Sequence, residues 1–333
     1  MEKVKQIVSE IKAREIKPIY FLMGDEPYYI DKISDFIAKN ILTEEEKGFN
    51  QVVVYGKDTS LDEVVSHAKR FPMMAEHQVV IVKEAQHLSR TIEQLTPYVE
   101  HPQPTTVLVI CYKYKKLDKR KKLYKSIAKT GILFESKKLY ENQVADWIRR
   151  VLSGKGYGIS PKSSAMLVEY LGTDLSKIDN ELQKLYLSVE KGQEITPDLI
   201  EKHIGISKDY NNFELKKAIA EHNLSKASKI VHYFSQNPKD NPFVVTITLL
   251  HTFFSQLLQY HGLKDQSPKS VAQNLGVNPY FVGEYQTAAK NYPMKRVSGI
   301  ISGLRKLDLK GKGLGAQNIS QDDLLKELLG LVY

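Results

Sequence analysis

Gly24 ends an apolar run at residues 18–23 and precedes a helix-like segment, which is where an α/β nucleotide-binding protein carries its phosphate loop. Such a loop needs glycines that let backbone N–H groups approach the phosphates, followed by Gly-Lys-Ser/Thr. The turn here reads Gly24-Asp25-Glu26-Pro27, with carboxylates that repel a triphosphate. Other Gly-Lys pairs lack the spacing and the hydroxyl; they begin at Gly56, Gly154 and Gly311. The sequence therefore predicts that this chain does not hydrolyse ATP.

Side chains that could hold a metal or act as a nucleophile are scattered. The nine histidines show no His-x-x-x-His spacing, and the single cysteine, Cys111, excludes both a cysteine-based zinc site and an intrachain disulfide. No Gly-x-Ser-x-Gly nucleophile turn is present. Asp322 and Asp323 follow Ser320 and fit the acidic first turn of a final helix better than a metal site. We predict no catalytic, cofactor or metal site.

Two adjacent methionines, Met73 and Met74, follow Phe71-Pro72 between a helix-like segment at 61–70 and a strand-like segment at 78–82. Periodicity alone favours side chains that close the local core. The alternative is an exposed contact site, because Pro72 stiffens the connection and adjacent side chains on a loop do not easily both point inward. Methionine suits such a site, since its flexible side chain adapts to a partner. The residues by themselves leave both interpretations open.

A basic run with interleaved tyrosines occupies residues 112–125. Its alternation of cations and aromatic rings is typical of a surface that follows a phosphate backbone. A solvated helix surface, anchored by Leu117, Leu123 and Ile127, explains the same pattern equally well. The candidate nucleic-acid contacts are Lys113, Lys115, Lys116, Lys119, Arg120, Lys121 and Lys122.

The composition is that of a folded, soluble protein. The chain has 333 residues, enough for two or three domains, and its net charge of +9 favours a polyanionic partner. A lone cysteine fits a reducing cytosol, and the amphipathic N-terminus has no signal-peptide core. The longest apolar stretch, at 242–258, is interrupted by polar residues, so we expect a cytoplasmic protein without a membrane span.

The elements that position these residues change in character along the chain. Up to residue 140, strand-like runs alternate with helix-like ones, which is typical of an α/β domain. Beyond residue 142 we expect helices alone, with N-terminal caps at Ser160-Pro161 and Thr196-Pro197. A polar, turn-rich segment at 206–212 then separates two helical parts. The predicted domains are an α/β domain at 1–140, a small helical domain at 141–209 and a helical domain at 210–333.

The order of these segments resembles that of the delta subunit family of bacterial DNA polymerase III. The similarity extends over essentially the whole chain, and its motifs are Pro18 to Glu26, Phe71-Pro72-Met73-Met74, Leu117 to Arg120, 143–150 with Trp147, 172–185, Phe213 to Ala218 and Leu304 to Lys310. The resemblance implies an AAA+-like α/β domain without a phosphate loop, a small helical lid-like domain and an all-α collar.

The resemblance also implies a role. Members of this family are non-catalytic subunits of the DNA-directed DNA polymerase holoenzyme, and they join the clamp-loader ATPase subunits (gamma/tau) and delta-prime in a hetero-pentamer. They bind the sliding clamp (beta) and open its ring, or trap it open, for loading onto primed DNA. By residue matching, the clamp-binding positions are Pro72, Met73 and Met74. The alternatives from the residues alone are a stand-alone nucleic-acid-binding protein and an active AAA+ ATPase.

Overall fold

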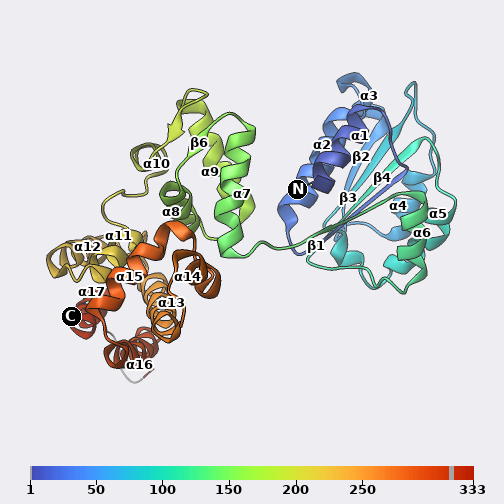
Figure 1. The fold of residues 1–333 in the computed structure, drawn as a ribbon. Helices are drawn as coiled ribbons and strands as arrows, with labels where there is room; N and C mark the ends of the chain where they lie inside the picture. Colours follow the sequence, from blue (N-terminus) through green and yellow to red (C-terminus); the bar gives the residue numbers. More distant parts are fainter. Residues whose placement is uncertain (1, 315–318) are drawn as a thin grey trace. The chain divides into compact units, whose positions relative to one another are not determined.

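The computed structural model describes residues 2–314 and 319–333. The chain divides into two compact units, Met1–Leu139 and Tyr140–Tyr333. The first is an α/β unit and the second is predominantly helical (Figure 1).

The α/β unit is built on a parallel sheet of five strands in the order β2-β3-β4-β1-β5. Every residue of β1 is buried, because neighbouring strands flank it and helices cover both faces of the sheet. Parallel strands place their carboxyl ends along one edge, so the residues that follow them meet there. The strands are β1 (Ile19–Gly24), β2 (Gln51–Tyr55), β3 (Gln78–Lys83), β4 (Thr106–Lys113) and β5 (Ile132–Ser136).

The two-residue period of the strands sorts their side chains between two cores. Tyr20 and Leu22 pack with α1 (Glu2–Lys12) and α2 (Pro27–Asn40). Phe21 and Met23 face the opposite layer, which consists of the helices α4 (Leu61–Ala68), α5 (Thr96–Glu100) and α6 (Lys122–Thr130) with the short 3₁₀ turns η1 (Ala85–Leu88) and η2 (Ile92–Leu95). A further short helix, α3 (Glu44–Asn50), runs directly into β2.

The first part of the second unit contains four helices. Ser160 and Thr196 cap two of them as predicted, by accepting backbone N–H groups, and Asp174, which was not predicted as a cap, does the same for a third. Our expectation of helices alone was wrong, because β6 (Gly158–Ile159) and β7 (Glu194–Ile195) pair in parallel. Strands of two residues have no periodicity to detect. The helices are α7 (Glu141–Gly154), α8 (Pro161–Leu171), α9 (Leu175–Ser188) and α10 (Pro197–Ile204).

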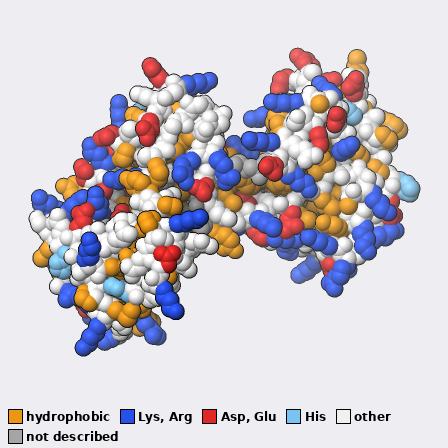
Figure 2. All heavy atoms as spheres, viewed as in Figure 1, with side chains coloured by type: hydrophobic (Ala, Val, Ile, Leu, Met, Phe, Trp, Pro, Cys, Tyr) orange, Lys and Arg blue, Asp and Glu red, His pale blue; other side chains and the backbone are white. Residues whose placement is uncertain are grey.

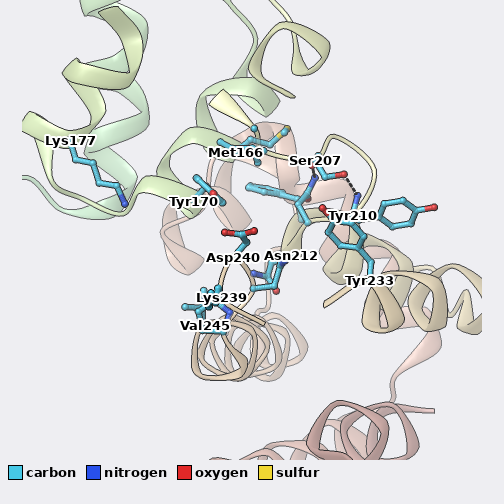
Figure 3. Close-up of a pocket in the computed structure, with 16 residues that line it drawn as sticks. Met166, Tyr170, Lys177, Ser207, Tyr210, Asn212, Tyr233, Lys239, Asp240 and Val245 are labelled. Carbon is cyan, nitrogen blue, oxygen red and sulfur yellow. Dashed lines mark hydrogen bonds between the residues drawn. The ribbon is translucent and has the colours of Figure 1, made fainter. Parts of the chain in front are cut away.

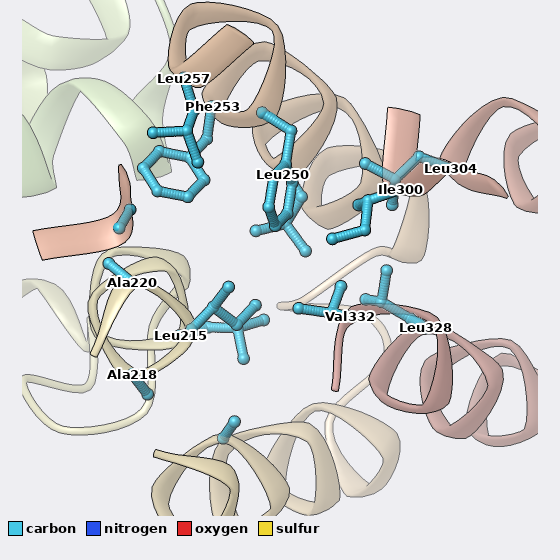
Figure 4. Packing of buried hydrophobic residues seen from close by; sticks show 14 of the residues in the cluster. Leu215, Ala218, Ala220, Leu250, Phe253, Leu257, Ile300, Leu304, Leu328 and Val332 are labelled. Carbon is cyan, nitrogen blue, oxygen red and sulfur yellow. The ribbon is translucent and has the colours of Figure 1, made fainter. Parts of the chain in front are cut away.

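The second part packs around one apolar core, part of which Figure 4 shows. Leu215, Leu250, Ile300 and Leu328 converge there from four different helices. The helices are α11 (Asn212–Ala220), α12 (Leu224–Gln236), α13 (Phe243–Gly262), α14 (Pro268–Leu275), α15 (Val282–Asn291), α16 (Met294–Gly311) and α17 (Gln321–Val332), with the 3₁₀ turn η3 (Pro279–Phe281) before α15.

Helix α13 is long and apolar enough to cross a membrane by length and composition. The same helix supplies Leu250, Phe253, Phe254 and Leu257 to the core of the helical unit. Its apolar character therefore has a structural explanation in the packing of α11 to α17.

The predicted arrangement, an α/β domain followed by helical regions, is confirmed. The segment at 206–212 is more ordered than its composition suggested, because Ile206 and Asn211 are buried and Asn211 caps α11. A bond from Lys162 of α8 to the buried carboxylate of Glu214 in α11 (2.8 Å) joins the two helical parts. The division of the helical unit at residue 209 stays a prediction.

Candidate functional site

The turn that follows β1 is closed by the chain's own atoms. The Asp25 N–H donates to the Ser136 carbonyl oxygen (3.2 Å), and the Glu26 N–H donates to the Ser136 hydroxyl (3.3 Å). The Glu26 carboxylate, itself buried, caps α2 by accepting from the Tyr28 N–H (3.2 Å). Gly24 has φ +124°, and a Cβ there would collide with the Ser136 carbonyl oxygen. The N–H groups of Asp25, Glu26 and Tyr28 thus have partners within the chain.

Beyond this turn, at the carboxyl edge of the sheet, Lys113 is enclosed by acids. Its Nζ lies 2.9 Å from Asp31 Oδ2 and 2.7 Å from Glu84 Oε1. Burial by itself would lower the pKa of Lys113, but the bonds to Glu84 and Asp31 outweigh it and raise that pKa. Lys83 lies beside Asp35 in the same way (2.8 Å). The charge of Lys113 is therefore balanced within the chain.

Most of the other candidate basic residues also have partners in the α/β unit. The shortest distances to acids are 2.8 Å for Lys116 to Asp25, 2.8 Å for Arg120 to Asp118 and 2.9 Å for Lys122 to Glu100, while Lys115 donates to the Ser89 hydroxyl at 2.7 Å. The hydrogen bonds with Arg120 lower the pKa of Asp118 to about 2. Lys119 and Lys121 are exposed.

Figure 2 shows cations and carboxylates on the visible face of each unit, with Lys and Arg side chains gathered along the lower edge of the α/β unit. The ion pairs of Lys116, Arg120 and Lys122 balance part of the positive charge of the 112–125 segment.

Met73 and Met74 lie on the loop between α4 and β3, and both side chains point into solvent. Met73 is 62% exposed and Met74 is fully exposed, and the neighbouring Phe71 is 75% exposed. Met74 has φ +52°, a left-handed conformation that costs a residue with a Cβ about 1–2 kcal/mol. The core interpretation of the two methionines is therefore wrong. We call residues 71–76 the methionine loop.

Two buried carboxamides hold this loop. The Asn50 side chain donates from Nδ2 to the Met73 carbonyl oxygen (2.9 Å) and accepts the Met73 N–H at Oδ1 (2.6 Å). At the base of the loop, Gln78 donates to the carbonyl oxygens of His67 (3.2 Å) and Arg70 and to the Thr106 hydroxyl (2.7 Å). The methionine side chains are therefore exposed on a backbone that is tied to the fold.

A pocket with a volume of about 290 Å³ lies in the helical unit. Figure 3 shows Tyr170, Tyr210 and Tyr233 on its wall, with Asp240 among them, and the rings of Tyr210 and Tyr233 stack at 5.0 Å. Its lining comes from α8, from α9, from the segment before α11 with the start of that helix, from α12, and from the α12–α13 connection with the start of α13. Within residues 2–314 and 319–333 there is no group of three or more His, Cys, Asp or Glu side chains that could hold a metal ion.

Comparison with known proteins decides the family. A model described as "DNA polymerase III, delta subunit" matches residues 20–137, and one described as "DNA polymerase III delta subunit, C-terminal domain" matches residues 209–328. The chain belongs to the DNA polymerase III delta subunit family. A relative in Bacillus subtilis (strain 168), DNA polymerase III subunit delta, is 28% identical over 320 residues, which cover 93% of this chain and 92% of the relative.

A solved structure of a delta protein is similar over the full length. That protein is the Bacillus subtilis DNA clamp loader delta protein, and its sequence is 26% identical to this chain. The structural match covers 99% of each chain, with a TM-score of 0.57. In this delta-family chain the methionine loop and the closed turn lie in the part that the first family model matches.

Sequence reasoning located the methionine loop but missed the residues that hold it. Neither Asn50 nor Gln78 belongs to a recognisable motif. Asn50 bonds to Met73, which is 23 residues away, and Gln78 bonds to Arg70, which is 8 residues away. The signal for each was a polar residue where an element ends or begins: Asn50 ends α3, and Gln78 begins the buried strand β3. The tyrosine pocket also had no signal, because its lining comes from five separate segments.

Proposed function

We propose that this chain binds the sliding clamp through Pro72, Met73 and Met74, and that it opens the clamp ring or traps it open for loading onto primed DNA. The observation that carries the proposal is the exposure of both methionine side chains on a loop whose backbone is held by buried hydrogen bonds. Family membership supplies the context, because the similar solved structure is a clamp-loader delta protein.

The energetics suit a reversible grip. Burying two methionine side chains in a partner's pocket contributes about 3–6 kcal/mol before losses. Methionine loses more rotamer freedom on binding than stiffer apolar residues. A held backbone reduces that loss, because only the side chains remain to be ordered.

Opening the ring needs no chemical step in this chain. A protein that fits the open form of a ring better than the closed form shifts the population toward the open form. ATP would act through the clamp-loader ATPase subunits (gamma/tau), with which this chain and delta-prime form the hetero-pentamer. The closed turn at Gly24 supports this division of labour, because its N–H groups already have partners in the chain.

DNA is proposed as a partner of the assembled complex in the cytoplasm. A contact through the 112–125 segment would fall to exposed residues such as Lys119 and Lys121, because Lys113 and Lys116 are paired with acids. This part of the proposal predicts a shallow salt dependence for DNA binding by the isolated chain, since few cations release counterions.

The decisive experiment replaces Met73 and Met74 by Ala together and measures binding to the cognate sliding clamp and to primed DNA in parallel. Clamp affinity should fall by about 100-fold or more. The two side chains are expected to contribute about 3–6 kcal/mol to binding, and each tenfold change in affinity corresponds to about 1.4 kcal/mol. DNA binding should not change. Met294→Ala is the matched control, because Met294 is also exposed but lies on α16. Unchanged clamp affinity in the double variant would show that the assignment is wrong.

A further inference from the structure

Asn50 makes an unusual set of contacts for a residue at the end of a short helix. It is only 3% exposed, and its Nδ2 donates to the Glu46 carbonyl oxygen of its own helix (3.1 Å) as well as to Met73. Its carboxamide satisfies both the N–H and the C=O of Met73. A residue in a β-ladder receives the same two bonds from an opposite backbone residue. Met73 is therefore fixed like a strand residue although it lies on a loop.

The position of Asn50 in the fold explains why it can do this. It is the last residue of α3 and is followed at once by β2, which pairs with β3. The methionine loop enters the same β3 at Gln78. The carboxamide is thus anchored through its own chain to the sheet on which the loop ends. This links Met73 to the sheet independently of Gln78, which holds the helix side of the loop.

The bonds to Met73 also bear on its neighbour. Met74 is held with φ +52° and is fully exposed. A strained backbone of this kind persists only where the surroundings over-determine it. The two hydrogen bonds to Met73 hold the residue directly before Met74, which favours the exposed position of the Met74 side chain.

We propose that Asn50 is a positioning residue for partner binding: its carboxamide presets the backbone of Met73, so that both methionine side chains are presented before the clamp arrives. The inference rests on the proposed function of the methionine loop. It assigns α3 to the recognition site although no contact between Asn50 and the clamp is required. Only Asn has the right length with one donor and one acceptor, because Asp lacks the donor and Ala lacks both.

The test is a double-mutant cycle on clamp binding with the full chain. Asn50→Ala should weaken binding about 5- to 20-fold, the range expected for losing two hydrogen bonds that preorganise a site. In the Met73→Ala/Met74→Ala background the same change should have no further effect, because no side chains remain to be positioned. A separate structural role would give the same loss in both backgrounds. Equal losses, or no loss in the single variant, would overturn the proposal.

Asn50→Asp guards against an effect of lost volume. It keeps the shape and the acceptor for the Met73 N–H but turns a carboxylate oxygen toward the Met73 carbonyl. It should therefore also weaken clamp binding.

Amide hydrogen exchange at Met73 supplies a readout without the clamp: protection in the wild type should be lost in Asn50→Ala. Ile30→Val, a mild change at a buried position in α2, is the control for general destabilisation.

The two proposals fail in different ways. If Met73→Ala/Met74→Ala leaves clamp binding intact, the proposed function and the role of Asn50 are both wrong. If the methionine variant loses binding while both Asn50 variants retain it, only the positioning role is wrong. Retained protection of the Met73 amide in Asn50→Ala would contradict the positioning role as well.

Discussion

The turn after β1 and the methionine loop before β3 belong to the same sheet but use their hydrogen bonds in opposite ways. At the closed turn, Ser136 and Glu26 occupy backbone N–H groups and the glycine is packed against the chain. At the methionine loop, Asn50 and Gln78 fix the backbone and leave large apolar side chains in solvent. Internal hydrogen bonds occupy backbone N–H groups at the closed turn, whereas at the methionine loop they hold a backbone whose apolar side chains are exposed.

The largest expected effect is on the closed turn. Gly24→Ala should lower the free energy of unfolding of the α/β unit by more than about 3 kcal/mol, because the methyl group meets Ser136 and the backbone has a positive φ. Urea unfolding followed by circular dichroism measures it. Trp147 fluorescence, which reports on the helical unit, should not shift.

Gly48→Ala is the control for this substitution. Gly48 lies in α3, and a Cβ there meets nothing within 4 Å. The helix should gain about 0.5–1 kcal/mol from the change. Equal effects at the two glycines would contradict the tight packing at Gly24.

Replacing a methionine by alanine should affect stability very differently at the buried Met23 and at the exposed Met73. Met23 is 1% exposed in β1, so Met23→Ala should cost about 2–5 kcal/mol of unfolding free energy. Met73→Ala should change it by less than about 0.5 kcal/mol, because the side chain is exposed. Clamp affinity should show the opposite pattern: Met73→Ala should weaken binding, whereas Met23→Ala, assayed at a temperature where it is folded, should not. A large loss of stability in Met73→Ala would break the comparison.

The complete burial of Cys111 in β4 should be visible in the pH dependence of stability. Burial raises the pKa of this thiol from 9.0 to about 11. Because the folded pKa is the higher one, the stabilisation is complete below pH 9 and is lost as the pH rises to about 11. Relative to Cys111→Ala, the wild type should lose on the order of 2 kcal/mol of unfolding free energy over this range.

A cysteine introduced at the exposed position of Met74 provides the contrast to the buried Cys111. Met74→Cys in the Cys111→Ala background should react rapidly with a thiol reagent at pH 8, whereas Cys111 in the wild type should react only on unfolding. Rapid labelling of Cys111 in the folded protein would contradict the burial of this thiol.

The smallest effect concerns the ion pairs at the sheet edge. Lys113→Met should lower the unfolding free energy by about 1 kcal/mol or less, because the pairs with Asp31 and Glu84 are partly solvated. The difference should shrink in high salt. Lys119→Met, at an exposed position, should have no measurable effect. A strong effect on DNA binding from Lys113→Met would restore this residue as a nucleic-acid contact.

The sequence alone predicted much of the fold. The apolar run at 18–23 indicates a buried strand, which β1 confirms, and the carboxylates of Asp25 and Glu26 after Gly24 predict a turn unsuited to phosphate. Proline and capping residues predicted the helix starts at Ser160 and Thr196. These features are local, so neighbouring residues specify them.

Only the tertiary structure decided which side chains are available to a partner. The backbone of Met73 is hydrogen-bonded to Asn50, which is 23 residues away, and Lys113 pairs with Asp31 and Glu84. Periodicity carries no record of such partners, because hydrogen bonds and ion pairs between distant segments form only when the sheet brings those segments together. For that reason the sequence left Met73 and Met74 open between core and surface, and folding placed them outside.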